Sequence, residues 1–264
     1  MSYLNENGDR LERRLKSEAV RRLMLALGAE GTFIANWVNH DPAFAQECAN
    51  QIKSFREKRE ERPGTPAEMA EDIMGTNVFG IGDAAINFAN AEILDTLRPH
   101  FCVVPYSVKT LREVRDSHIL FAFLPLTFLE ILGKYCVHVK RPPDQYAWVK
   151  KCSFANEKLE SGWWLLSKEL IYSKKPLALI DFDLAHSLYR TPHATLLLYA
   201  MAARKMSVEE HLFQGLFART SCRDNDGFPI HIGYEGERLC IGSYPESNPH
   251  KKIGVACIKG QGIA

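Results

Sequence analysis

The last third of the chain alternates short apolar runs with turn residues, and this pattern constrains the fold more than any other feature. Strand-like runs cover residues 216–223, 228–235, 238–244 and 253–258. The sequence DNDG joins the first pair at 224–227, and EGE joins the next pair at 235–237. An Asp-Gly pair between strands indicates a hairpin, because glycine takes the positive φ that a tight turn needs. We therefore expect an antiparallel β-meander in this part of the chain.

Helix signals dominate the first two thirds of the chain. Apolar residues recur every fourth position from 11 to 27, which places one apolar stripe on a helix. Ser/Thr-x-x-Glu capping boxes, in which a hydroxyl and a carboxylate each bond to the backbone, stand at 65–68, 127–130 and 207–210. Thr191 and Pro192 are expected to begin the most apolar helix, which should end near Lys205.

Strand signals also occur upstream of the meander. Apolar runs predict strands at 101–106 and 118–124 with a helix at 107–115 between them, which together make a β-α-β unit, and further strands at 163–171 and 177–182. The sequence thus predicts an α+β fold, in which helical N-terminal segments accompany a mixed sheet that ends in the C-terminal antiparallel β-meander. The break at Pro63 and Gly64 predicts a basic, charged helical segment at 1–62 and an α+β domain at 63–264. The alternative is one continuous domain, 1–264.

Composition limits the cellular setting and the partners. The net charge of +1 gives no attraction of the whole molecule to nucleic acid or acidic lipid, so such a partner requires a local patch. Seven scattered cysteines, an odd number, argue against a secreted disulfide framework. The polar N-terminus lacks the apolar core of a signal peptide, and the most apolar stretch, 119–133, is shorter than the ~20 residues of a membrane span. We expect a cytoplasmic protein without membrane association.

Two aspartates form the sharpest candidate for a metal site. Asp181 and Asp183 close the predicted strand at 177–182, and residues two apart on a strand face the same side. Paired carboxylates are ligands that suit Mg²⁺, as in phosphoryl-transfer enzymes. The alternative is two acids that end a strand at the surface, since no glycine-rich phosphate loop accompanies them. The sequence identifies no other cofactor.

The first helix carries the candidate nucleic-acid contact. Its arginines cluster opposite the apolar stripe, within about 100° on a helical wheel; they are Arg10, Arg13, Arg14 and Arg21. Four arginines on one face suit contacts to phosphates. The alternative is an ordinary solvated face, in which acidic residues pair with basic ones four positions later.

Several short blocks occur along the chain in a fixed order. They are NVFG at 77–80, VPYS at 104–107, Leu111, DSHIL at 116–120, PL at 125–126, GW at 162–163, Lys168, Pro192, RTS at 219–221, GY at 233–234 and GVA at 254–256. In these blocks the chain resembles an uncharacterised family of bacterial and phage-associated hypothetical proteins. The resemblance implies one co-inherited unit after about Asn77, with the basic N-terminal part outside it. It implies no activity, cofactor or catalytic residue, and Asp181 and Asp183 do not match the family's pattern.

Two functions of different classes follow from these features. The first is a binding or assembly protein of unknown partner, either nucleic acid at the first helix, another protein or a second copy of the chain. It is favoured by the absence of a catalytic signature and by Trp163 and Trp164, one of which should face away from the core on a regular strand. The alternative is a metal-dependent hydrolase or phosphoryl-transfer enzyme that uses Asp181 and Asp183. His118, at the start of a strand, is expected to be a core histidine, the alternative being a site residue.

Overall fold

The computed structural model describes residues 65–88, 96–139, 143–171, 184, 189–245 and 252–259. These residues all belong to one compact unit, Thr65–Ala264. The predicted helix with the apolar stripe, the basic segment 1–62 that contains it and the predicted strand at 177–182 lie outside the described residues.

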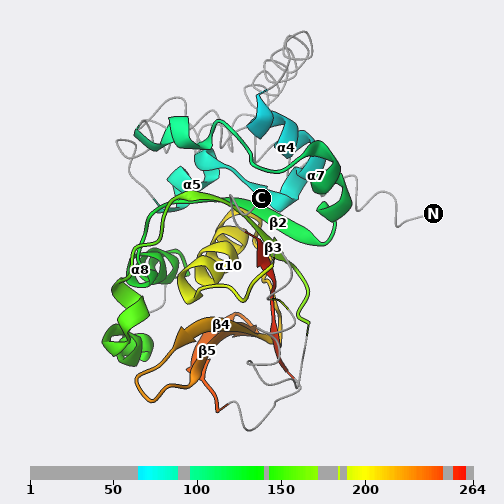
Figure 1. The fold of residues 1–264 in the computed structure, drawn as a ribbon. Coiled ribbons are helices and arrows are strands. Elements are labelled where there is room, and N and C mark those ends of the chain that lie inside the picture. The colour runs from blue at the N-terminus through cyan, green and yellow to red at the C-terminus, as the bar shows by residue number, and fades with distance from the viewer. Residues whose placement is uncertain are drawn as a thin grey trace, which may run out of the picture. The chain divides into compact units, whose positions relative to one another are not determined.

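The described part of the chain combines helices with two mixed sheets, so the predicted α+β class is confirmed (Figure 1). The first sheet has the order β1-β2-β3-β8, with β1 at Val78–Phe79, β2 at His118–Phe123, β3 at Gly162–Ser167 and β8 at Ile258–Lys259. Strand β1 runs parallel to β2, and the other neighbours are antiparallel. The second sheet has the order β6-β5-β4-β7, with β4 at Phe217–Arg223, β5 at Pro229–Glu235, β6 at Arg238–Ser243 and β7 at Ile253–Val255.

Strands β4, β5 and β6 form the predicted antiparallel meander. At its first turn the Asp224 carboxylate accepts hydrogen bonds from the backbone N–H groups of Asp226 and Phe228, at 3.0 and 2.8 Å. Gly227 has a φ of 82°, the left-handed conformation that glycine adopts without strain. The Asp-Gly segment is therefore a hairpin turn built from local bonds.

The predicted last strand, 253–258, is wrong as a single element, because it divides between the two sheets. Strand β7 pairs in parallel with β4, and β8 pairs antiparallel with β3. Between them, the N–H of Cys257 donates to the Ser167 hydroxyl, and the N–H of Ser167 donates to the Cys257 carbonyl, both at 2.9 Å. This short segment thus ties the meander to the first sheet.

The helices lie around and between the sheets. The α-helices described in full are α4 (Pro66–Met74), α5 (Ile81–Phe88), α7 (Val108–Val114), α8 (Phe128–His138) and α10 (Ala194–Val208); the 3₁₀ helices are η2 (Gly75–Asn77), η3 (Arg98–Phe101), η4 (Pro143–Lys151) and η5 (Ser153–Asn156). Both capping bonds form at Thr65 and at Thr127, as predicted. No helix in the described ranges is long and apolar enough to cross a bilayer.

Helix α10 is the centre of the core. Its first eleven residues are all buried, and the helix contacts β2 of the first sheet as well as β4 and β5 of the second (Figure 1). A helix enclosed on all sides is expected to be apolar all round rather than striped. Its N-cap is His193, whose Nδ1 accepts from the N–H of Thr195, so the predicted start at Thr191 is wrong. The helix continues past Lys205, and the predicted capping box at 207–210 is wrong because its first residues end α10.

The predicted β-α-β unit is also wrong in its first strand. Residues 101–106 contain the end of η3 followed by bends, and Pro105 removes one of the N–H groups that a central strand needs. The Phe101 carbonyl instead accepts a hydrogen bond from the Trp163 indole at 3.3 Å. The parallel partner of β2 is β1, the short strand at 78–79.

Candidate functional site

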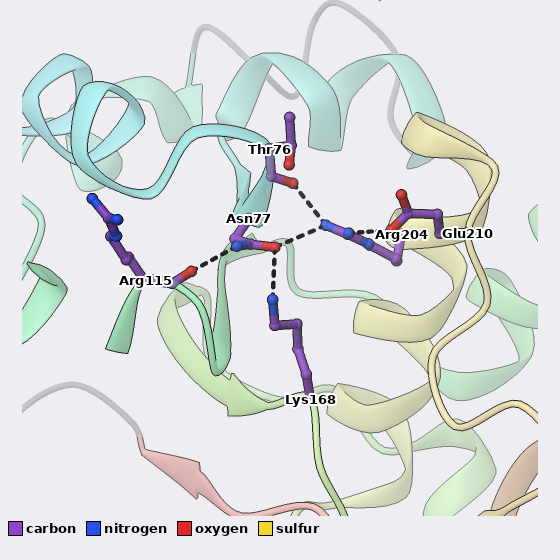
Figure 2. Close-up of polar contacts among 6 residues, drawn as sticks. All are labelled: Thr76, Asn77, Arg115, Lys168, Arg204 and Glu210. Atoms are coloured by element: carbon purple, nitrogen blue, oxygen red, sulfur yellow. Dashed lines mark hydrogen bonds and ion pairs between the residues drawn. The ribbon is translucent and has the colours of Figure 1, made fainter. Parts of the chain in front are cut away.

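A polar cluster surrounds the carboxamide of Asn77, and we call it the Asn77 cluster. Its members are Thr76, Asn77, Arg115, Lys168, Arg204 and Glu210 (Figure 2). They come from η2, the end of α7, the residue after β3, α10 and the loop that follows α10. Segments that are far apart in the sequence therefore meet at one side chain.

The Asn77 carboxamide has a partner for both of its polar atoms. Its Nδ2 donates to the Arg115 carbonyl at 2.6 Å. Its Oδ1 accepts from Arg204 Nη1 at 3.1 Å and from Lys168 Nζ at 3.4 Å. Figure 2 shows that Arg115 contributes only its backbone carbonyl, while its side chain points away from the cluster. Because only Oδ1 can accept from two cations, these contacts fix the orientation of the amide.

Arg204 is the buried cation of the cluster, with only 6% of its surface exposed. Besides Asn77, its guanidinium donates to the Thr76 carbonyl at 2.7 Å and forms an ion pair with Glu210. The guanidinium also lies 5.9 Å from the centre of the Phe79 ring. A buried charge is tolerated where it is paired and its donors are used, so these contacts assign Arg204 a structural role.

Lys168 is the second cation, and it is only partly buried. Within the described ranges, Asn77 Oδ1 is the one hydrogen-bond acceptor of Nζ, and no carboxylate forms an ion pair with it. Lys168 Nζ and Arg204 Nη1 lie 3.4 and 3.1 Å from the same oxygen, so they are at most about 6.5 Å apart. Burial and then the Arg204 charge lower the pKa of Lys168, against a weaker opposite effect of nearby acids.

His118 lies next to Lys168, because it pairs with Ser167 across β2 and β3. Its Nδ1 is 2.9 Å from the Ser117 hydroxyl, and its ring centre is 5.7 Å from that of Tyr189. Burial and then the Lys168 charge lower the pKa of His118, which favours the neutral imidazole. His118 is partly buried at the start of its strand and is not enclosed in the core. It borders the Asn77 cluster because its strand partner, Ser167, precedes Lys168.

The structure does not test the site residues predicted from sequence. Arg10, Arg13, Arg14 and Arg21, and likewise Asp181 and Asp183, lie outside the described residues. Within the described ranges, no group of three or more His, Cys, Asp or Glu side chains could hold a metal ion. The candidate nucleic-acid and metal contacts therefore stay predictions.

Sequence reasoning missed Arg204 and Glu210. A signal for Arg204 was present, because it is the first charge in the otherwise apolar run ATLLLYAMAAR of α10 and so indicates a buried cation. Lys168 was identified from sequence only as part of the family resemblance. It contacts two other blocks of that resemblance, because its Nζ donates to Asn77 and its backbone N–H donates to the Ser117 carbonyl.

The two adjacent tryptophans do not present a free aromatic surface. Trp163 is buried, and Trp164, on the opposite face of β3, is partly buried against the core. The expectation that one of them faces away from the core is wrong because both faces of β3 are covered.

Comparisons with known proteins leave the site to be interpreted from its own chemistry. No protein-family model, no curated protein and no solved structure matches the chain. The resemblance described from the sequence therefore remains an expectation.

Proposed function

We propose that this protein is a non-enzymatic binding protein, and that it recognises a phosphate group of an acidic partner through Lys168. The observation that carries the proposal is the ammonium group of Lys168, partly exposed beside a buried guanidinium, with one long hydrogen bond and no carboxylate in contact among the described residues. An ammonium has three donors, and Asn77 occupies one. The other two are available to an oxyanion.

The electrostatics of the Asn77 cluster favour an anionic ligand. Arg204 forms an ion pair with Glu210. Lys168 forms no such pair among the described residues, and nearby acids stabilise its charge only weakly. An oxyanion at Nζ supplies the charge that keeps the amine protonated and accepts charge-assisted hydrogen bonds, which are about twice as strong as neutral ones. In this arrangement Arg204 does not touch the ligand; it holds Asn77 and adds positive potential.

Nucleic acid is the partner class that the neighbouring surface supports best. Lys109, Arg112 and Arg115 are exposed and lie three residues apart along α7. The end of α7 abuts the cluster, because the Arg115 carbonyl contacts Asn77. Asp116, 3.2 Å from Arg115, reduces the positive potential there without cancelling it, since an exposed pair is weak. These cationic side chains lie outside the cluster, so they suit contacts to further phosphates of a partner that binds Lys168 through one phosphate.

The remaining parts of the proposal rest on the sequence. The arginines of the first helix would extend the phosphate-binding surface, and a protein partner or a second copy would use other parts of the chain. A cytoplasmic location is supported by the described cysteines, which form no disulfide with one another. A bacterial or phage origin rests on the family resemblance alone. The alternative of a metal-dependent enzyme gains no support from the described residues, because Asp181 and Asp183 lie outside them.

The test is fluorescence anisotropy of a labelled 20-nucleotide single strand titrated with the full chain, at a series of salt concentrations. Lys168→Met keeps most of the side-chain volume and removes the charge. Lys134→Met, on the exposed face of α8, is the matched control. We expect weaker binding for Lys168→Met only, and a salt slope reduced by ~0.7, the value of one contact to a single strand.

Two results would contradict the proposal. One is equal affinity of the two variants for the oligonucleotide. The other is the absence of binding by the unmodified chain at the lowest salt concentration. Circular dichroism of each variant establishes that a loss of binding is not a loss of fold.

A further inference from the structure

The same geometry gives Lys168 a chemical property that does not depend on any macromolecular partner. We infer that, among the lysines that the structure describes, Lys168 is the one that small acyl phosphates acylate most readily. Its Nζ lies within about 6.5 Å of a guanidinium nitrogen, is partly shielded from water and contacts no described carboxylate. Like charge and burial both disfavour the ammonium form and so favour the free amine.

Only the free amine is a nucleophile, and this is why the neighbourhood of Lys168 matters. Three other described lysines have different surroundings. Lys205 forms an ion pair with Glu237 at 3.0 Å. Lys134 and Lys150 are exposed to water. Lys205 therefore serves as the reference for an amine in an ion pair, and Lys134 and Lys150 serve as references for exposed amines.

The reaction is a simple acyl transfer. The lone pair of Lys168 Nζ attacks the acyl carbon, the bond from that carbon to the phosphate oxygen breaks, and inorganic phosphate leaves. The proton lost by the nitrogen passes to solvent, and the product is a neutral amide. The phosphate of the donor is an oxyanion and is attracted by the positive potential of Arg204, which brings the acyl carbon close to the uncharged amine.

Acylation also has a consequence for the binding proposed above. An amide carries no charge and cannot attract a phosphate. Modification of Lys168 would therefore switch off the recognition of the acidic partner. This consequence rests on the proposed function, whereas the reactivity of Lys168 does not.

The experiment treats the full chain with acetyl phosphate between pH 6.5 and 9.5 and measures initial acetylation at each lysine by peptide mass spectrometry. At pH 7 we expect Lys168 to react at least about threefold faster than Lys134 and Lys150, since more of it is uncharged. The rate at Lys168 should also level off at a lower pH. This second criterion compares how the acetylation rate of each lysine changes with pH. Steric access does not affect it, because access scales the rate equally at every pH.

Two substitutions shift the profile in opposite directions. Asn77→Asp places a carboxylate at the amine and should move the Lys168 profile to higher pH. Glu210→Gln removes the counter-charge of Arg204 and should move it to lower pH. If Asn77→Asp does not fold, the unmodified chain and Glu210→Gln still decide the matter.

The inference is overturned if the Lys168 profile coincides with that of Lys134, or if Glu210→Gln moves it to higher pH. Its failure is distinct from failure of the proposed function. Fast acetylation of Lys168 in a chain that binds no oligonucleotide refutes the proposed function alone. Oligonucleotide binding that depends on Lys168, with an ordinary acetylation profile, refutes the inference alone.

Discussion

Replacing Arg204 by methionine separates the structural cation of the Asn77 cluster from the functional one. Arg204→Met removes the bonds from the guanidinium to the Thr76 carbonyl, to Asn77 Oδ1 and to Glu210. A hydrogen bond from a charged group contributes about 1.5–3 kcal/mol, and removing a buried charge returns part of this loss. Glu210 is half exposed and regains water. We therefore expect a net cost of about 2–3 kcal/mol in the free energy of unfolding.

Urea denaturation of the full chain, followed by circular dichroism, measures this cost as a change in midpoint at unchanged slope. Lys168→Met should cost less than about 1 kcal/mol, because its single hydrogen bond is long and its side chain is partly exposed. The reasoning is refuted if Arg204→Met lies within 1 kcal/mol of the unmodified chain, or if Lys168→Met destabilises it by the same amount.

Two further predictions concern the core and its response to pH. Tyr199→Phe should cost about 1–2 kcal/mol in thermal or urea denaturation, because the fully buried Tyr199 hydroxyl donates to the Ala122 carbonyl at 2.9 Å and that acceptor would lose its partner; no change would contradict this. Burial is the largest cause that lowers the pKa of three histidines, so each is favoured neutral in the folded state; they are His118, His193 and His211. The unfolded chain then binds more protons below about pH 6.5, and stability should fall as the pH decreases from about 6.5 through the folded pKa values. Replacing His211 by Gln should flatten this dependence in urea titrations at pH 7.5 and 5.5, and an unchanged slope would contradict the explanation.

Local chemistry made part of the fold predictable. The capping boxes at Thr65 and Thr127 and the hairpin turn at Gly227 are determined by bonds within a few residues, and the structure contains all of them. The meander could be predicted from the sequence because its turn residues and its strand periodicity indicate the same structure. The capping box at 207–210 failed as a helix start because Ser207 and Val208 belong to the last turn of α10, which is capped at Glu209 in the left-handed conformation.

Long-range contacts made the rest unpredictable. The division of 253–258 between two sheets depends on which strand edges are unoccupied, and no local pattern carries that information. One hydrogen bond of the Asn77 cluster spans 128 positions, the bond from Arg204 to the Thr76 carbonyl. Apart from the blocks of the family resemblance that contain Asn77 and Lys168, the cluster's sequence signal was a single cation in an apolar helix, which predicts a buried partner without identifying it.

The most direct test of the account is the pKa of Lys168, measured by NMR titration of the ¹³Cε resonances of the lysines. In the free protein the pKa of Lys168 should lie below the ordinary lysine value of about 10.4, because burial and Arg204 disfavour its charge. Addition of a saturating short oligonucleotide should raise the pKa of Lys168, since the phosphate supplies a counter-charge. A Lys168 pKa at or above the ordinary value in the free protein, or one that the oligonucleotide does not raise, would contradict the assignment of Lys168 as an anion-recognition residue.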